Sequence, residues 1–230
     1  MEKFKYRNLT LFKILLTMGL FFVFWDIGCI IGWNKVFSGT RNFYGVDCYS
    51  SLLKILFCVI FFILIKYYEK DLKFSLKEMF TRFDLKLFSV SFSVLFILEL
   101  IMMFIIHKGW NFNVSNVPLI FGYLIVGFTE EFICRGYVFN ALYSKIEYKK
   151  ANIFQAIYFA VWHIVPYVPV WIKQRAINME QLRYVFIWNI PSCIITGIIY
   201  GYIMKRTKSL WIPILLHASM DYLACLFYMN

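Results

Sequence analysis

Long apolar runs alternate with short polar stretches along this chain. A helix needs about 20 mostly apolar residues to cross the hydrocarbon core of a bilayer. Seven segments have this length or nearly so, and we expect each to be a spanning helix whose ends are uncertain by a few residues. They cover residues 10–33, 50–68, 87–107, 117–142, 152–172, 184–204 and 209–229. No linker or internal repeat separates them, so the pattern predicts one all-α, polytopic transmembrane helix bundle over residues 1–230.

Composition supports this class and argues against a water-soluble protein. The chain is 61% hydrophobic and 16% charged, whereas soluble domains are roughly 45–50% apolar and about 25% charged. The net charge of +11 does not indicate nucleic-acid binding, because the basic residues lie between the apolar runs and form no basic domain. The expected surroundings are a lipid bilayer. The six cysteines lie mostly in apolar runs without a CxxC pair, so we expect buried thiols and no disulfide framework.

Lysine and arginine residues are distributed unevenly between alternate loops, and cytoplasmic loops carry the excess in membrane proteins. With a cytoplasmic N-terminus, 16 of the 24 fall inside and 7 outside, while Arg135 lies within a span. The seven outer residues are Lys35, Arg41, Lys54, Lys108, Lys173, Arg175 and Arg183. This bias predicts a multi-pass protein of the cell membrane with its N-terminus in the cytoplasm. The abundance of Lys, Ile, Phe and Asn suggests an AT-rich bacterial genome.

Several ionisable residues lie inside the predicted spans, where they normally face the bundle interior or a wet cavity. Glu130, His163, His217 and Asp221 belong to three different spans. At 1.5 Å per residue, they lie roughly 12–18 Å from the inner ends of those spans. The hydrocarbon core is about 30 Å thick. Groups from three helices therefore reach one layer near the midplane, which predicts a single polar site within the membrane.

The spacing of these residues suggests how they pair. Glu131 and Arg135 are four residues apart with the acid first, the favourable order for a helical ion pair. Glu130 is rotated by about 100° from Glu131 on the helix and lacks that partner. A carboxyl group without a cation in a low-dielectric site suits acid–base chemistry. His217 and Asp221 are also four apart, so the carboxylate can orient the imidazole.

The remaining ionisable residues are interpreted more simply. Phe159 shares a helix face with His163 and can supply an aromatic wall for the imidazole. Asp26 and Glu99 have no partner of opposite sign four residues away, and we interpret them as structural residues or secondary residues of the cavity. His107 ends its span at the outer surface and is expected to be interfacial.

Three motifs thus follow one another in the second half of the chain, each inside a predicted span. They are Glu130-Glu131-x-x-x-Arg135, Phe159-x-x-x-His163 and His217-x-x-x-Asp221. Gly136 follows the first motif, and the stretch 209–217 leads into the third. In this order the motifs resemble the CAAX-protease and bacteriocin-processing (CPBP, or Abi) family of intramembrane endopeptidases. The resemblance covers roughly residues 127–222 and predicts a catalytic core of about 117–229.

The resemblance implies a role for each matching residue. Glu130 would activate a water as general base, and His163 would help to hold that water. His217 and Asp221 would stabilise the oxyanion of the tetrahedral intermediate, while Glu131, Arg135 and Phe159 would support the site. The family often has Asn at the last position. Since an ionised Asp221 would repel an oxyanion, it either carries a proton or orients His217 instead.

A metal ion is an alternative that the sequence leaves open. Glu130, His163, His217 and Asp221 could supply nitrogen and oxygen ligands to zinc. The HExxH pattern of zinc peptidases is absent, and the resemblance favours a metal-free glutamate mechanism. We therefore expect no required cofactor. The serine and aspartate motifs of other intramembrane proteases, GxSx and GxGD, are also absent.

The expected function is an intramembrane endopeptidase that hydrolyses a peptide bond in a membrane-associated peptide or protein precursor. Since bacteria generally lack prenylated CAAX substrates, maturation of a bacteriocin or signalling peptide, or self-immunity, is favoured over prenyl-protein processing. One alternative is a non-enzymatic immunity or scaffold protein with the same fold. Another is a transporter or proton relay, although the inverted repeats typical of transporters are not evident.

Overall fold

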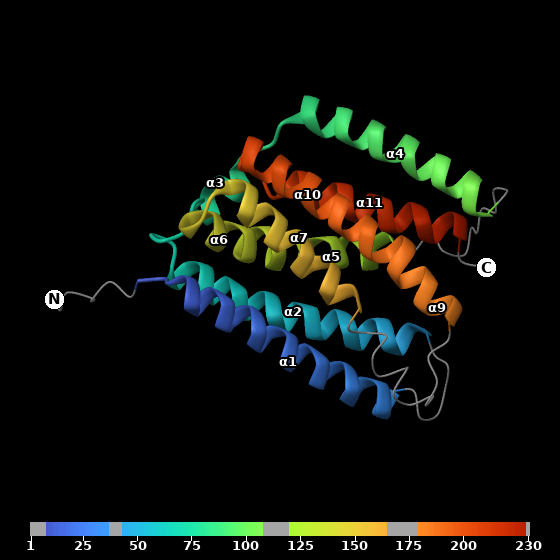
Figure 1. The fold of residues 1–230 in the computed structure, drawn as a ribbon, viewed down its shortest axis with the longest axis horizontal. Coiled ribbons are helices and arrows are strands. Elements are labelled where there is room, and N and C mark those ends of the chain that lie inside the picture. Colours follow the sequence, from blue (N-terminus) through green and yellow to red (C-terminus); the bar gives the residue numbers. More distant parts are fainter. Residues whose placement is uncertain (1–7, 37–42, 108–119, 165–178, 229–230) are drawn as a thin grey trace.

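The computed structural model describes residues 8–36, 43–107, 120–164 and 179–228, and these ranges contain helices and turns but no strand. The helices follow the predicted segments in order, with the short α3 as an addition (Figure 1). They are α1 (Leu11–Val36), α2 (Phe43–Tyr67), α3 (Leu76–Thr81), α4 (Leu85–His107), α5 (Ile120–Glu131), the π-helical η2 (Phe132–Phe139), α6 (Asn140–Lys145), α7 (Tyr148–Ile164), α9 (Met179–Tyr184), the π-helical η3 (Val185–Asn189), α10 (Ile190–Thr207) and α11 (Trp211–Tyr228). The all-α class is confirmed. Residues 117–119, 165–172 and 229 of the predicted spans lie outside the described ranges.

Two helical segments in the described part of the chain are long and apolar enough to cross a membrane by themselves. They are Leu11–Ile31 and Leu182–Thr207. The count of seven spans therefore stays a prediction. The predicted span 117–142 is less apolar than these two segments, because Glu130, Glu131 and Arg135 all lie within it and lower its hydropathy.

The outer faces of the helices carry large apolar side chains. Phe12 on α1, Leu52 on α2 and Phe121 on α5 are 72%, 67% and 73% exposed. Water-soluble monomers rarely expose contiguous apolar surface of this extent. An outer surface of this composition suits contact with lipid.

The continuous segment α5–η2–α6 forms the middle of the bundle, and each residue from Thr129 to Leu142 is buried. Figure 1 shows α1 and α2 on one side of this segment and α11, α10 and α4 on the other. An aromatic cluster joins α1, α2 and α7, since the ring of Phe21 meets those of Phe57 and Trp162 at centroid distances of 4.9 Å in both cases. Edge-on contacts of this kind add to the stability gained from burial.

Two sets of side chain–backbone hydrogen bonds connect helix ends near the α2–α3 connection. The side chain of Asn140 donates to the carbonyl oxygen of Phe74 and accepts from its N–H, both at 2.8 Å. The indole N–H of Trp211, at the start of α11, donates to the carbonyl oxygen of Phe80 at 2.9 Å. The first contact ties the α2–α3 connection to α6 of the central segment, and the second ties α11 to α3.

A close helix contact brings α11 against α5. A Cβ atom on Gly127 would lie 2.9 Å from the backbone nitrogen of Ala218, the carbonyl oxygen of Ile214 and the Cβ of Ala218. Two of these atoms belong to the backbone of α11 and cannot move aside without moving the helix. The absence of a side chain at Gly127 therefore allows α5 and α11 to pack this closely.

We expect Gly127→Ala to push α11 away from α5 and to destabilise the fold by about 1–3 kcal/mol, the usual cost of overpacking. The matched control is Gly122→Ala on the same helix, where an added Cβ meets nothing within 4 Å. Thermal unfolding of the two purified variants would check this expectation, and equal stability would contradict it.

Candidate active site

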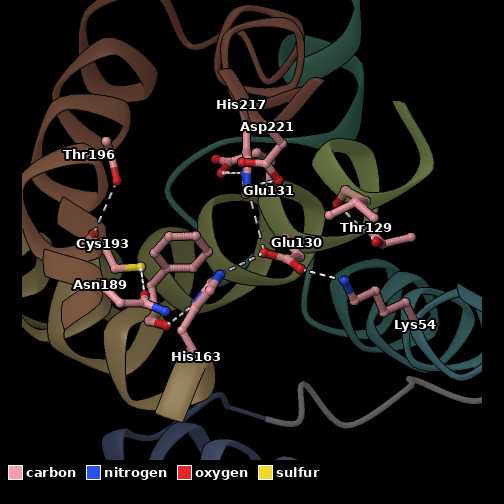
Figure 2. Close-up of polar contacts among 12 residues, drawn as sticks. Lys54, Thr129, Glu130, Glu131, His163, Asn189, Cys193, Thr196, His217 and Asp221 are labelled. Atoms are coloured by element: carbon pink, nitrogen blue, oxygen red, sulfur yellow. Dashed lines mark hydrogen bonds and ion pairs between the residues drawn. The ribbon is translucent and has the colours of Figure 1, made fainter. Parts of the chain in front are cut away.

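One carboxylate oxygen meets two imidazoles in the middle of the bundle. Glu130 comes from the end of α5, His163 from the end of α7 and His217 from α11 (Figure 2). The Nε2 atom of His163 lies 3.4 Å from Oε2 of Glu130, and the Nε2 atom of His217 lies 3.7 Å from the same oxygen. The structure therefore brings together the three residues that the sequence placed at one depth.

The two oxygens of Glu130 have different surroundings. Oε1 accepts from the ammonium group of Lys54 at 2.6 Å. Oε2 is buried and has no hydrogen-bond partner among the described residues. The prediction that Glu130 lacks a cationic partner was wrong, because it considered only residues on the same helix. Lys54 reaches the carboxylate from α2, 76 residues earlier in the chain.

Lys54 was also misassigned in the count of loop charges. The prediction placed it with the outer residues, but its side chain is 12% exposed and points to Glu130 (Figure 2). It lies 13 residues before the end of α2 at Tyr67, which is about 20 Å along a helix. That depth is close to the layer predicted for the site. A cation inside an apolar run was the signal that could have identified it, since such residues mark functional sites in membrane proteins.

Glu131 links the first and third motifs. Its Oε1 accepts from Arg135 at 2.8 Å and from Nδ1 of His217 at 2.8 Å. Both Glu131 and Arg135 are completely buried. The predicted ion pair between them is therefore present, and it also orients the imidazole of His217, since a carboxylate can only accept and the proton must lie on Nδ1.

Asp221 takes a different position from the one expected for an orienting carboxylate. Its Oδ2 lies 3.4 Å from Nε2 of His217, and its side chain is 39% exposed at the edge of the site. The shorter contact at Nδ1 comes from Glu131. Glu131 therefore holds the ring of His217, while Asp221 faces the same nitrogen atom as Glu130 does.

Phe159 forms the wall between the charged groups, as its spacing from His163 predicted. Its ring lies 4.4 Å from that of His163 and 5.6 Å from that of His217, measured between centroids. The guanidinium of Arg135 sits 4.5 Å from the ring of Phe159 and 5.3 Å from that of Tyr200. Arg135 belongs to η2, and π-helical turns are frequent at functional sites.

The backbone of Phe159 also sets the orientation of His163. Nδ1 of His163 lies 2.8 Å from the carbonyl oxygen of Phe159, and because a carbonyl only accepts, Nδ1 is the donor. The other nitrogen, Nε2, is thereby turned toward Glu130. Beside His163, the thiol of Cys193 donates to Oδ1 of Asn189 at 3.2 Å (Figure 2).

The remaining ionisable residues that the sequence singled out are Asp26, Glu99 and His107. Asp26 is partly buried on α1. Glu99 and His107 belong to α4, and their side chains lie outside the described residues. The structure pairs none of the described cysteines in a disulfide.

The donor set does not fit a metal ion well. The described residues contain no group of three or more His, Cys, Asp and Glu side chains arranged to hold one. In addition, the ammonium of Lys54 occupies one oxygen of Glu130 and would repel a divalent cation at that carboxylate.

Comparison with known proteins finds a match in the second half of the chain. Residues 112–223 match the family model of type II CAAX prenyl endopeptidase Rce1-like proteins. None of the curated proteins and none of the solved structures matches the chain. The matched segment holds all three motifs, and Lys54 on α2 lies outside it. Through residues 112–223, this chain belongs to the CPBP family of membrane-embedded proteases, with the Rce1-like endopeptidases as the matching group.

Proposed function

We propose that this protein is an intramembrane endopeptidase in which Glu130 activates a water to hydrolyse a peptide bond. The observation that carries the proposal is the free oxygen of Glu130, faced by imidazoles from two other helices at 3.4 and 3.7 Å. A general base and positioned hydrogen-bonding groups in a buried site are what hydrolysis by an activated water needs.

The first step uses Oε2 of Glu130 and Nε2 of His163. Their 3.4 Å separation is too long for a direct hydrogen bond of ordinary length. A water beside them can reach both atoms with hydrogen bonds of about 2.8 Å. Glu130 takes one proton from this water, and the water oxygen attacks the carbonyl carbon of the substrate. The proton then passes to the nitrogen of the leaving amine as the carbon–nitrogen bond breaks.

The oxyanion of the intermediate is assigned to His217. Nδ1 donates to Glu131, and Arg135 in turn balances the charge of Glu131. A second proton on Nε2 makes the ring a cationic donor toward the developing negative charge. Asp221, 3.4 Å from that nitrogen, accepts from it when no substrate is bound.

The substrate class is proposed from the surface chemistry and from the bacterial origin that the composition suggests. The apolar outer surface suits a membrane-associated peptide or protein precursor, and a bacterial origin favours maturation of a bacteriocin or signalling peptide, or self-immunity, over prenyl-protein processing. Mass spectrometry of membrane peptides from cells with and without the gene tests this directly. New peptide ends that require the intact gene support the proposal.

The same experiment with variants separates catalysis from a scaffold role. Glu130→Ala, His163→Ala and His217→Ala are each expected to abolish the new peptide ends while the protein stays in the membrane at normal levels. If the biological activity survives all three changes, a non-enzymatic immunity or scaffold protein replaces the peptidase. If the three changes instead alter the flux of protons or solutes, the protein is a transporter.

Removal of metal ions is expected to leave cleavage unchanged, because Lys54 and the two imidazoles supply the charges around Glu130. The measurement is the initial cleavage rate of purified protein after treatment with EDTA and with 1,10-phenanthroline. A zinc peptidase in the same assay provides the control and should lose its activity. Loss of cleavage that added zinc restores would contradict the metal-free mechanism.

A further inference from the structure

The role of Lys54 goes beyond the family motifs, and it rests on the proposed peptidase function. We propose that Lys54 is a positioning residue of the active site. Its ammonium holds Oε1 of Glu130 so that Oε2 is the oxygen presented to His163 and His217.

The contact between Lys54 and Glu130 is short and enclosed. The two atoms are 2.6 Å apart, and the side chains are 12% and 7% exposed. A lysine in the interior of a membrane bundle is costly and persists where it has a partner and a function. Surface pairs in this chain are looser, such as Lys66 with Glu69 at 3.3 Å and 52% and 33% exposure.

A second contact fixes the register of the two helices at this point. Cys58, one helical turn after Lys54, donates its thiol proton to the carbonyl oxygen of Thr129 at 3.6 Å. Thr129 directly precedes Glu130. Lys54 and Cys58 therefore meet neighbouring residues of α5, which places the ammonium at the carboxylate by helix packing as well as by charge.

The geometry explains why the reaction needs this contact. A carboxylate can rotate about its terminal bond and exchange its two oxygens. With Oε1 held on α2, the group turns its other oxygen toward the imidazoles. The ammonium also offsets the negative charge of Glu130, whose surroundings include the acidic residues Glu131 and Asp221. Lys54 on α2 lies outside the matched residues 112–223, so the family motifs do not assign it this role.

The kinetic test compares Lys54→Met, Lys54→Arg and Lys66→Met in detergent or nanodiscs with one cleavable peptide. Methionine keeps most of the length of the side chain and removes its charge. We expect Lys54→Met to lower kcat by about 10-fold or more with little change in KM, as misplacement of a reacting group does. Lys54→Arg should recover most of the loss, and Lys66→Met on the same helix should match the wild type. A wild-type kcat for Lys54→Met, or a change confined to KM, would overturn the proposal.

A thermal unfolding cycle tests the contact without using activity. Lys54→Met and Glu130→Gln should each lower Tm. The double variant should lose less Tm than the two single losses added together, because it leaves no buried charge without a partner. If Lys54→Met does not accumulate but the double variant does, the ion pair is supported as well. Additive losses, or failure of both variants to accumulate, would count against it. If the two residues are coupled but the wild-type protein cleaves no peptide, the proposed peptidase function is wrong and the contact between Lys54 and Glu130 still stands.

Discussion

Glu130→Gln is expected to lower kcat for precursor cleavage by roughly 10²–10⁴-fold, the usual contribution of a general base. Glutamine keeps the shape of the side chain, but its amide cannot take the proton of the attacking water. Oε2 of Glu130 is the oxygen that faces Nε2 of both His163 and His217, and no other carboxylate among the described residues faces both imidazoles. The measurement is kcat for a defined precursor peptide with purified protein in lipid nanodiscs.

Two further measurements separate this effect from loss of structure. Glu147→Gln is the matched control, since that side chain is 78% exposed and its ion pair with Lys150 spans 3.6 Å. This control should cleave at the wild-type rate. Size-exclusion profiles of Glu130→Gln and the wild type should coincide. Substantial cleavage by Glu130→Gln would mean that another group activates the water.

Arg135→Met is expected to destabilise the fold by about 3–5 kcal/mol, the cost of leaving a buried charge without its partner. Arg135 and Glu131 are both fully buried and 2.8 Å apart. The guanidinium also lies against the rings of Phe159 and Tyr200, and methionine would lose both contacts. Unfolding in detergent, followed by circular dichroism, gives the change in the free energy of unfolding.

The double variant shows whether the uncompensated charge is the cause. Arg135→Met with Glu131→Gln should regain a large part of the lost stability, because no isolated carboxylate then remains in the core. Arg206→Met provides the control, since Arg206 is exposed at the end of α10. An exposed substitution of this kind usually changes stability by less than about 0.5 kcal/mol. Equal stability of Arg135→Met and Arg206→Met would contradict the structural role of the pair.

Contacts within one helix could be predicted from spacing. Residues four apart lie on one face, so Glu131 with Arg135 and Phe159 with His163 were expected as neighbours, and the structure contains both contacts. The pairing of His217 with Asp221 also exists at 3.4 Å, but the spacing gave it a more important role than it has. The stronger partner of His217 is Glu131, which comes from a different helix.

The helical class, the order of the helices and most residues of the site could be read from the sequence, although Lys54 was missed. These follow from the length of the apolar runs, and from the common depth at which Glu130, His163 and His217 interrupt them, since a polar group in an apolar layer is stable only among other polar groups. The tertiary structure decided which polar groups pair. Lys54 reaches Glu130 across 76 residues and His217 reaches Glu131 across 86. The rotation of one helix against another selects such partners, and packing with the whole bundle fixes that rotation.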